Sequence, residues 1–254
     1  MTGRVTIVGL GPGDPRWLTP AASEALTSAT DLIGYGPYVD RIGERPRQRR
    51  HGSDNRVELD RARFALDLAE KGARVAVVSG GDPGVFAMAA AVFEAIENGD
   101  PAWRELDIRV EPGITAMLAA AARVGAPLGG DFCAMSLSDN LKPWDIVEKR
   151  LRAAVEADFA VALYNPISSA RPWQLGAALK IVSEIRSQDT PIILARAVGR
   201  PDESIRILPL ADVEASMADM STMVIIGAST TRLIERPGNE APYVYTPRFY
   251  GVRP

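Results

Sequence analysis

Short apolar runs alternate with amphipathic stretches along the first half of the chain. Strand-like runs cover residues 6–9, 31–34, 75–79 and 108–110. Between several of them, apolar positions recur at the spacing of one helix face, which predicts helices over 59–70, 85–98 and 114–124. Thr19-Pro20, an N-cap residue followed by a proline, begins a further helix after the first run. This alternation is typical of a parallel sheet with helical crossovers.

A segment of small residues at 125–130 interrupts this pattern and predicts a domain boundary, with one domain over 1–124 and the other over 125–254. The connection between the runs 191–196 and 204–209 is too short for a helical crossover, so these two strands should be antiparallel. The fold class is therefore two α/β domains, with a parallel Rossmann-like sheet in the first and a mixed sheet in the second. The second domain should hold strands over 133–137, 160–164, 191–196, 204–209 and 222–226, and helices over 143–157 and 173–186.

Composition narrows the class of protein. The chain has 254 residues and 46% hydrophobic content, enough for sizeable cores. Its net charge of −3 argues against a nucleic-acid partner bound through a basic face, and no apolar run is long enough to cross a membrane. The single cysteine, Cys133, excludes an internal disulfide and a multi-cysteine metal site. We therefore expect a cytoplasmic protein with no bound metal, and Cys133 as a small core residue.

Glycine-rich loops follow three of the predicted strands. The first is Gly9-Leu-Gly-Pro-Gly-Asp14, the second is Ser79-Gly-Gly-Asp-Pro-Gly84, and the third is Glu111-Pro-Gly-Ile-Thr-Ala116. Open parallel sheets bind ligands at the carboxyl ends of their strands, so these loops predict one shared ligand site. Neither of the first two has the lysine and hydroxyl of a P-loop. The alternative is that all three are tight connections without a ligand.

A dinucleotide site is the second alternative. Gly9, Gly11 and Asp31 stand where a glycine loop and a ribose-binding acid belong in an NAD-binding Rossmann protein. Asp14 occupies the third glycine position of that pattern, and its carboxylate would repel a pyrophosphate. The sequence therefore disfavours NAD.

The loop motifs resemble the tetrapyrrole methylase superfamily, which uses S-adenosylmethionine, and the resemblance spans nearly the whole chain. It rests on Gly-Leu-Gly-Pro-Gly-Asp-Pro at 9–15, Ser-Gly-Gly-Asp-Pro-Gly-Val-Phe-Ala-Met at 79–88 and Pro-Gly-Ile-Thr-Ala at 112–116. Residues 131–144 and 163–166 are similar to the branch that methylates carbon 17 of a corrin precursor and contracts its ring in cobalamin biosynthesis. Gly130 stands where many relatives carry a histidine, so a histidine base cannot act there.

The resemblance implies two α/β domains with a five-stranded sheet in each, a homodimer, and a cofactor in the cleft between the domains. The cofactor would be S-adenosyl-L-methionine, with S-adenosyl-L-homocysteine as its product. Carried over position by position, the cofactor-binding residues are Pro12, Gly80, Gly81, Asp82, Val85, Thr115, Ala116, Tyr164, Asn165, Arg196, Ala197, Thr222 and Met223.

The implied substrate is a tetrapyrrole with acetate and propionate carboxylates. Arg47 and Arg49, from an arginine-rich segment at 41–50, and Lys142 are the predicted substrate-binding residues, although a solvated charge run is the alternative for the arginines. Asp14 is the candidate for the proton transfer that ring contraction needs, with a helix-capping carboxylate as its alternative. His51 could shuttle a proton or be a surface residue. Whether the substrate is metal-free or contains cobalt stays open.

Overall fold

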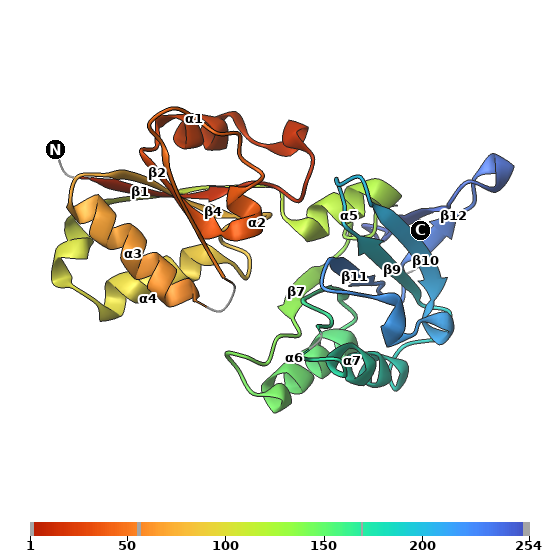
Figure 1. The fold of residues 1–254 in the computed structure, drawn as a ribbon. Coiled ribbons are helices and arrows are strands. Elements are labelled where there is room, and N and C mark those ends of the chain that lie inside the picture. Colours follow the sequence, from red (N-terminus) through yellow and green to blue (C-terminus); the bar gives the residue numbers. More distant parts are fainter. Residues whose placement is uncertain (1–2, 55–56, 169, 251–254) are drawn as a thin grey trace. The chain divides into compact units, whose positions relative to one another are not determined.

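The computed structural model describes residues 3–54, 57–168 and 170–250 and divides into two compact units, Met1–Ala116 and Met117–Pro254 (Figure 1). The sequence placed the boundary after residue 124. The helix α5 (Ala116–Val124) accounts for the difference, because it is held within the second unit. Arg123 in this helix pairs with Glu203 at 2.9 Å, and the backbone amide of Met117 donates to the hydroxyl of Tyr164 at 3.3 Å.

The first unit contains a five-stranded sheet of order β3-β2-β4-β1-β5 with all its neighbours parallel. Four of its strands confirm the predicted runs. The fifth, β3, was not predicted, because its sequence Arg-Arg-His-Gly-Ser has no apolar pattern and it lies at the edge of the sheet. The strands are β1 (Arg4–Gly9), β2 (Asp31–Tyr35), β3 (Arg49–Ser53), β4 (Arg74–Ser79) and β5 (Asp107–Glu111).

Helices cover both faces of this sheet (Figure 1). Helices α3 (Glu58–Glu70) and α4 (Met88–Asn98) pack on one face against Val5, Ile7 and Val77. On the other face, α1 (Pro20–Ser28) packs with α2 (Gly36–Val39) against Val8 and Val78. As predicted, Thr19 caps α1, accepting a hydrogen bond from the Ala22 amide at 3.1 Å. Two short 3-10 helices complete the unit, η1 (Pro15–Trp17) and η2 (Pro101–Glu105).

The second unit contains a five-stranded mixed sheet, as predicted, and the order of its strands is β10-β9-β11-β8-β7. Strands β7 and β8 are parallel, whereas β10 pairs antiparallel with β9, which confirms the expectation from their short connection. The strands are β7 (Phe132–Ser136), β8 (Ala160–Tyr164), β9 (Pro191–Arg196), β10 (Ser204–Pro209) and β11 (Thr222–Ile226). Helices α6 (Trp144–Glu156) and α7 (Gln174–Ser183) pack on its apolar core, with the 3-10 helices η3 (Leu210–Asp212) and η4 (Ala215–Met217).

A third, three-stranded sheet was not predicted. Its order is β12-β13-β6, and it consists of β12 (Arg232–Ile234), β13 (Tyr243–Tyr245) and β6 (Gly125–Ala126), with the 3-10 helix η5 (Pro237–Asn239) between the first two. Part of the small-residue segment that was predicted to mark the domain boundary is therefore a strand. The amide of Thr246 donates to the carbonyl of Ala126 at 3.0 Å, which fixes this segment to the C-terminal part of the chain.

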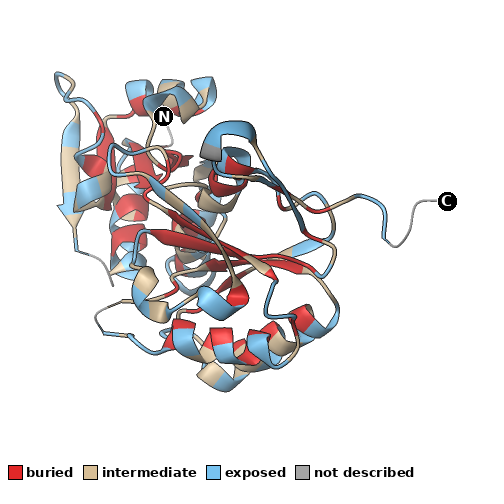
Figure 2. Ribbon diagram, turned by 90° about the vertical axis from the view of Figure 1, so that its right-hand side faces the viewer, coloured by how far each residue is buried: buried red, intermediate tan, exposed pale blue. Residues whose placement is uncertain are grey.

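Buried residues concentrate along the central strands of the two large sheets and on the helix faces that cover them (Figure 2). Cys133 packs, half-buried, against the core of the second unit, and burial raises the pKa of its thiol. Across the described ranges, none of the helices has the length and apolar character needed to span a bilayer.

Candidate functional site

The three glycine loops of the first unit meet at the carboxyl edge of its sheet. They follow β1, β4 and β5, which are adjacent because β1 lies between the other two. Gly11 and Gly81 exchange backbone hydrogen bonds of 3.1 and 3.0 Å, so the first two loops are joined directly. Both glycines have positive φ, +66° and +68°, a conformation in which a side chain would be strained.

The backbone of the third loop packs closely against the backbone of this pair. A Cβ atom on Gly113 would lie 2.3 Å from the Gly81 carbonyl oxygen, and one on Gly9 would lie 2.6 Å from the Gly113 nitrogen. Neither distance is possible between real atoms, so glycine is required at both positions. The junction therefore presents an edge made of backbone, which lets a ligand approach main-chain amides and carbonyls closely.

Asp82 locks the junction. One of its carboxylate oxygens accepts the Gly84 amide at 2.8 Å, and the other accepts the Gly113 amide at 3.0 Å. Asp82 was predicted to bind the cofactor. The structure shows that its side chain links the second loop to the third, so we infer that it orders the loops that would hold the ligand.

Residues from outside the loops support the same edge, and the sequence analysis did not assign them this role. The ring of Tyr38 lies against Gly80, where a Cβ would be 2.7 Å from its Cζ atom. Arg41 donates from Nη2 to the carbonyls of Leu10 and Gly11 at 3.4 and 3.3 Å. Arg41 was noted only as part of the arginine-rich segment, and periodicity gives no signal for such a long-range contact.

Positive φ in residues other than glycine marks several predicted positions. Asn165, Ala197 and Arg47 have φ of 51°, 50° and 66°. Phe86, at 51°, follows the predicted Val85 and is 51% exposed. Such conformations cost about 1–3 kcal/mol and cluster at functional sites. Phe86 also explains why α4 begins at Met88 rather than at the predicted position 85.

Of the remaining predicted residues in the first unit, Pro12 and Thr115 are buried and Ala116 is half-buried. Thr115 and Ala116 follow Gly113 at the start of α5, beside Gly81, whose Cβ would lie 3.7 Å from the Thr115 Cα. The structure thus brings the first-unit positions Gly80, Gly81, Asp82, Thr115 and Ala116 to one edge. A backbone cradle with small residues fits a nucleoside-containing cofactor.

Asp14 is engaged in a capping arrangement. Its carboxylate accepts the Arg16 amide at 2.9 Å, which caps the 3-10 helix η1, and pairs with the Arg16 guanidinium at 2.5 Å. The hydrogen bonds that the Arg16 guanidinium donates to the Asp14 carboxylate raise the pKa of Arg16. The geometry matches the capping alternative, while proton transfer by Asp14 stays a prediction.

Asp31 lies at the wrong end of its strand for the dinucleotide alternative. It is the first residue of β2, at the amino edge of the sheet, whereas the glycine loops are at the carboxyl edge. It is fully buried and accepts hydrogen bonds from Arg49 and His51. Burial raises its pKa, but hydrogen bonds from Arg49, His51 and Thr30 outweigh burial and leave the pKa below its ordinary value. Asp31 therefore does not lie where the ribose-binding acid of the NAD alternative belongs.

The arginine-rich segment is partly a strand. Arg49 begins β3 and binds both carboxylate oxygens of Asp31 at 2.8 Å, so its guanidinium is already occupied. His51 contacts the same carboxylate at 2.9 Å and packs edge-on against Phe64. Arg47, which precedes the strand, is exposed. The structure therefore separates the two predicted substrate-binding arginines into a structural pair and an exposed candidate.

The predicted residues of the second unit gather at one edge of its own sheet. Tyr164 and Asn165 lie at the end of β8, and Arg196 and Ala197 at the end of β9. Thr222 begins the antiparallel strand β11 and pairs in register with Arg196, with Met223 beside it. Asn165 donates from Nδ2 to the hydroxyl of Ser136 at 2.9 Å, which ties the end of β7 to the same edge.

The side chains of Arg196 and Thr222 both bind the carboxylate of Asp219. Arg196 pairs with Asp219 at 2.7 Å and with Asp202 at 2.9 Å. The Thr222 hydroxyl donates to Asp219 at 2.8 Å. We infer that these side chains hold the edge in place, and that a ligand here would bind through the backbone around Ala197 and Met223. The predicted placement of the cofactor between the domains stays a prediction.

Lys142 lies in the loop after β7. Its Nζ donates to the Ser138 carbonyl at 3.1 Å. Burial lowers its pKa, and the nearby Arg150 and Arg171 lower it further against the opposing effect of Asp139. A cationic group surrounded by other cations is typical of a site for an anion.

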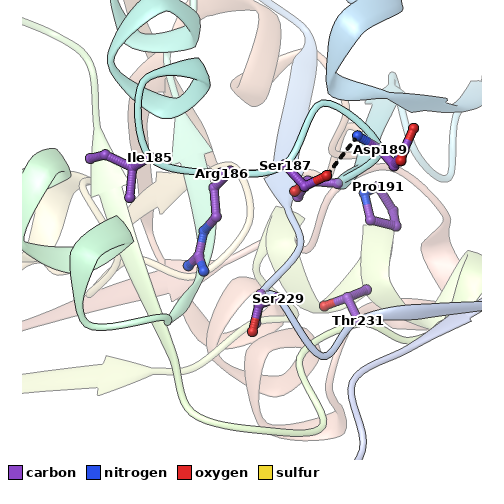
Figure 3. A pocket seen from close by; sticks show the side chains of 9 residues that line it. Ile185, Arg186, Ser187, Asp189, Pro191, Ser229 and Thr231 are labelled. Atoms are coloured by element: carbon purple, nitrogen blue, oxygen red, sulfur yellow. Dashed lines mark hydrogen bonds between the residues drawn. The ribbon is translucent and has the colours of Figure 1, made fainter.

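A cavity of about 300 Å³ in the second unit contains none of the predicted site residues (Figure 3). It lies where β9 begins and where the chain leaves β11, lined among others by Arg186, Ser187 and Ser229. Arg186 is buried and paired with Asp158, whose carboxylate also accepts the hydroxyl of Ser229 at 2.6 Å. This network stabilises the folded connections, and the cavity adds no candidate chemistry.

Comparisons with known proteins agree with the motifs. The model of the family "Tetrapyrrole (Corrin/Porphyrin) Methylases" matches residues 4–214. The chain is 56% identical to a precorrin-3B C(17)-methyltransferase of Sinorhizobium sp over 98% of both chains. It is 36% identical to a probable cobalt-factor III C(17)-methyltransferase of Salmonella typhimurium, covering 89% of this chain and 93% of that one. The crystal structure of the methyltransferase CobJ is 53% identical, with a TM-score of 0.91 over 96% of this chain and 100% of that chain.

Proposed function

Because the chain belongs to the tetrapyrrole methylases, we propose that it methylates precorrin-3B at carbon 17 and contracts the macrocycle to precorrin-4 in cobalamin biosynthesis. The observation that carries this proposal is the 56% identity to a precorrin-3B C(17)-methyltransferase over nearly the whole of both chains. A shared catalytic step is expected at this level of likeness, because the loops at both sheet edges are included in the match.

Members of this family use S-adenosylmethionine. The cofactor supplies an electrophilic methyl group when it is bound. We propose that the glycine junction around Gly81 and Gly113 binds it through main-chain groups, with Asp82 holding the loops in order. Titration calorimetry with S-adenosylhomocysteine and with NAD tests this: binding of S-adenosylhomocysteine alone is expected, and binding of NAD alone would refute it.

The protein's contribution to methyl transfer is mainly alignment. Carbon methylation needs an in-line approach in a site without water, and well-oriented reactants gain roughly 7–11 kcal/mol. We expect the contacts of Arg41 and Tyr38 with the junction to hold the first-unit loops in position for the reaction. Ring contraction also moves protons, and we propose Asp14 on the first loop for that task.

The alternative substrate is cobalt-factor III, favoured by the relative from Salmonella typhimurium. The higher identity to the enzyme named for precorrin-3B supports the metal-free substrate. Purified protein assayed separately with metal-free precorrin-3B and cobalt-factor III decides between the two. Faster turnover of the cobalt-containing substrate would overturn the first choice.

We further propose a homodimer acting in the cytoplasm. Support comes from the motif resemblance, from the prevalence of twofold assemblies, and from the presence of a single cysteine, which suits a reducing compartment. Light scattering at micromolar protein should give twice the mass of the 27.3 kDa chain. A monomer mass would contradict the dimer.

A further inference from the structure

A group of charged side chains lies beside the carboxyl edge of the second sheet, and Lys142 is its one member among the predicted substrate-binding residues. The loop after β7 carries Asp139 and Lys142, and Arg171 lies just before α7. Arg150, exposed on α6, adds a further positive charge close to Lys142. Three cations thus share the surroundings of one carboxylate, Asp139, which leaves a local excess of positive charge.

Among the described residues, Arg171 forms one ion pair, with Asp139, and the two groups are far apart for such a pair. Its Nη1 atom lies 4.0 Å from the nearest Asp139 oxygen, beyond hydrogen-bonding distance. That Nη1 atom is buried and has no hydrogen-bond partner among the described residues. A buried guanidinium donor without a partner is costly, so the arrangement is suited to receive an acceptor.

The side chain of Gln174 also leaves a buried polar atom without a hydrogen-bond partner among the described residues. It is 1% exposed, and its Nε2 donates to the second Asp139 oxygen at 3.1 Å. Its Oε1 atom is buried without a partner within the described part of the chain. Gln174 therefore holds Asp139 at the position where it faces Arg171, while neither side chain is fully satisfied.

The backbone around this group is fixed and connected to the predicted cofactor edge. Ser168 and Arg171 exchange backbone hydrogen bonds of 3.0 and 2.9 Å. The hydroxyl of Ser136 accepts the Ser138 amide at 3.2 Å and the Asn165 side chain at 2.9 Å. The loop that carries Asp139 and Lys142 thus begins at a contact with Asn165, a residue predicted to bind the cofactor.

Apolar surface adjoins the charges. Leu141, in the same loop, is 97% exposed, and Trp173, between Arg171 and Gln174, is 48% exposed. Trp173 packs edge-on against Trp144 at 4.8 Å, so its ring is held in place. An apolar ring with carboxylates at its periphery would meet both kinds of surface here.

We propose that Arg171 and Lys142 form a receptor for a peripheral carboxylate of the macrocycle, and that Asp139 occupies Arg171 until that carboxylate displaces it. Asp139 then acts as a competing anion, and Gln174 keeps it in place. The inference rests on the proposed tetrapyrrole substrate and adds the residues that select it by charge.

Substitutions with opposite expected signs test this receptor. Arg171→Gln and Lys142→Gln should each raise KM for precorrin-3B by about 10- to 100-fold with kcat little changed, the range for loss of a hydrogen bond to a charged group. Asp139→Asn keeps an acceptor for Gln174 but removes the competing charge, so it should lower KM by roughly threefold or more at low salt. Arg206→Gln, which removes an exposed arginine on β10, is the matched control and should leave KM unchanged.

A second measurement separates this inference from the proposed function. Quenching of tryptophan fluorescence by uroporphyrin III, and by the same porphyrin with its carboxylates converted to amides, reports carboxylate binding without turnover. The carboxylated porphyrin should bind more weakly to Arg171→Gln, with Arg171→Lys intermediate because lysine keeps the charge but not the fork. If wild type fails to methylate precorrin-3B but these porphyrin affinities follow the expected order, only the proposed function fails. If KM and porphyrin affinity are unchanged in folded Arg171→Gln, or if Asp139→Asn weakens binding, the receptor is refuted.

Discussion

Gly113→Ala should disable the junction of the three glycine loops while leaving the second unit intact. The added methyl group would lie 2.3 Å from the Gly81 carbonyl oxygen and 3.0 Å from the Gly9 carbonyl carbon. Both are backbone atoms, which cannot rotate away as a flexible side chain would. The loop must therefore shift, and the hydrogen bond from the Gly113 amide to Asp82, 3.0 Å long, must stretch or break.

The magnitude follows from these two effects. Overpacking a fixed site costs about 1–3 kcal/mol, and a weakened hydrogen bond to a charged group costs up to about 3 kcal/mol. A shift of the loop relieves part of the steric overlap while it weakens the hydrogen bond, so the two costs do not add in full. We therefore expect a loss of about 2–4 kcal/mol in the stability of the first unit. This corresponds to a fall of roughly 8–16 °C in its unfolding midpoint, at about 4 °C per kcal/mol. Displaced main-chain groups should also weaken S-adenosylhomocysteine binding at least tenfold, or about 1.4 kcal/mol.

Two further alanine variants calibrate the measurement. A Cβ on Gly43 would meet nothing within 4 Å, so Gly43→Ala should behave as wild type. On Gly81 the nearest atom is 3.7 Å away, so Gly81→Ala should cost only the strain of positive φ, about 1–2 kcal/mol. Thermal unfolding and calorimetric titration should therefore rank Gly43→Ala above Gly81→Ala above Gly113→Ala. Wild-type affinity and midpoint in Gly113→Ala would refute the proposed close packing of the loops.

Three other outcomes are expected. Asp14→Asn should bind S-adenosylhomocysteine normally, keep some methylation and lose ring contraction by about 100-fold. Arg16→Gln removes the guanidinium that pairs with Asp14 but leaves the carboxylate, so it should retain contraction. Equal loss of contraction in both variants, measured by mass and absorption spectra, would reduce Asp14 to a helix cap. Arg47→Gln should raise KM for the tetrapyrrole, with the effect shrinking at high salt. Arg49→Gln should instead lower the unfolding midpoint, because it leaves buried Asp31 without its bidentate partner. The reverse pattern would contradict the assignment of Arg47 to substrate binding and of Arg49 to a structural role. The folded pKa of Asp31 lies below its unfolded value of about 3.9, so its contribution to stability is full above that pH and is lost as the pH falls through the folded pKa. The unfolding midpoint should therefore fall less steeply with acid in Asp31→Asn than in wild type. Parallel plots of midpoint against pH for the two proteins would contradict the lowered pKa.

The fold was predictable where burial is complete on both faces of a strand. The run 191–196 reads Pro-Ile-Ile-Leu-Ala-Arg and forms β9, with its central residues buried. The edge strand β3 was missed because its arginines and histidine are fixed by Asp31, a partner distant in the sequence, rather than by an apolar face. Strands of two or three residues, as in β6 and β13, carry no periodic signal, and their pairing joins segments more than a hundred residues apart.

The positions of the candidate site were predictable from the glycine loops, but the roles of its side chains were not. The family resemblance assigned Asp82 and Thr222 to the cofactor site without showing that both are bound to neighbouring protein groups. Likewise, nothing in the local sequence distinguishes Arg41, which supports the first loop, from Arg49, which neutralises Asp31. These roles depend on tertiary contacts, and only a structure supplies them.

Methylation at carbon 17 is tested most directly by supplying purified protein with precorrin-3B and S-adenosylmethionine carrying a carbon-13 methyl group. Mass spectrometry should show one added labelled methyl, and carbon-13 NMR should place it on carbon 17 of a contracted macrocycle. At limiting cofactor, Gly113→Ala should form the same product at least about tenfold more slowly than wild type. A labelled methyl on any other carbon, or no transfer by folded wild type that binds S-adenosylhomocysteine, would contradict the proposed function.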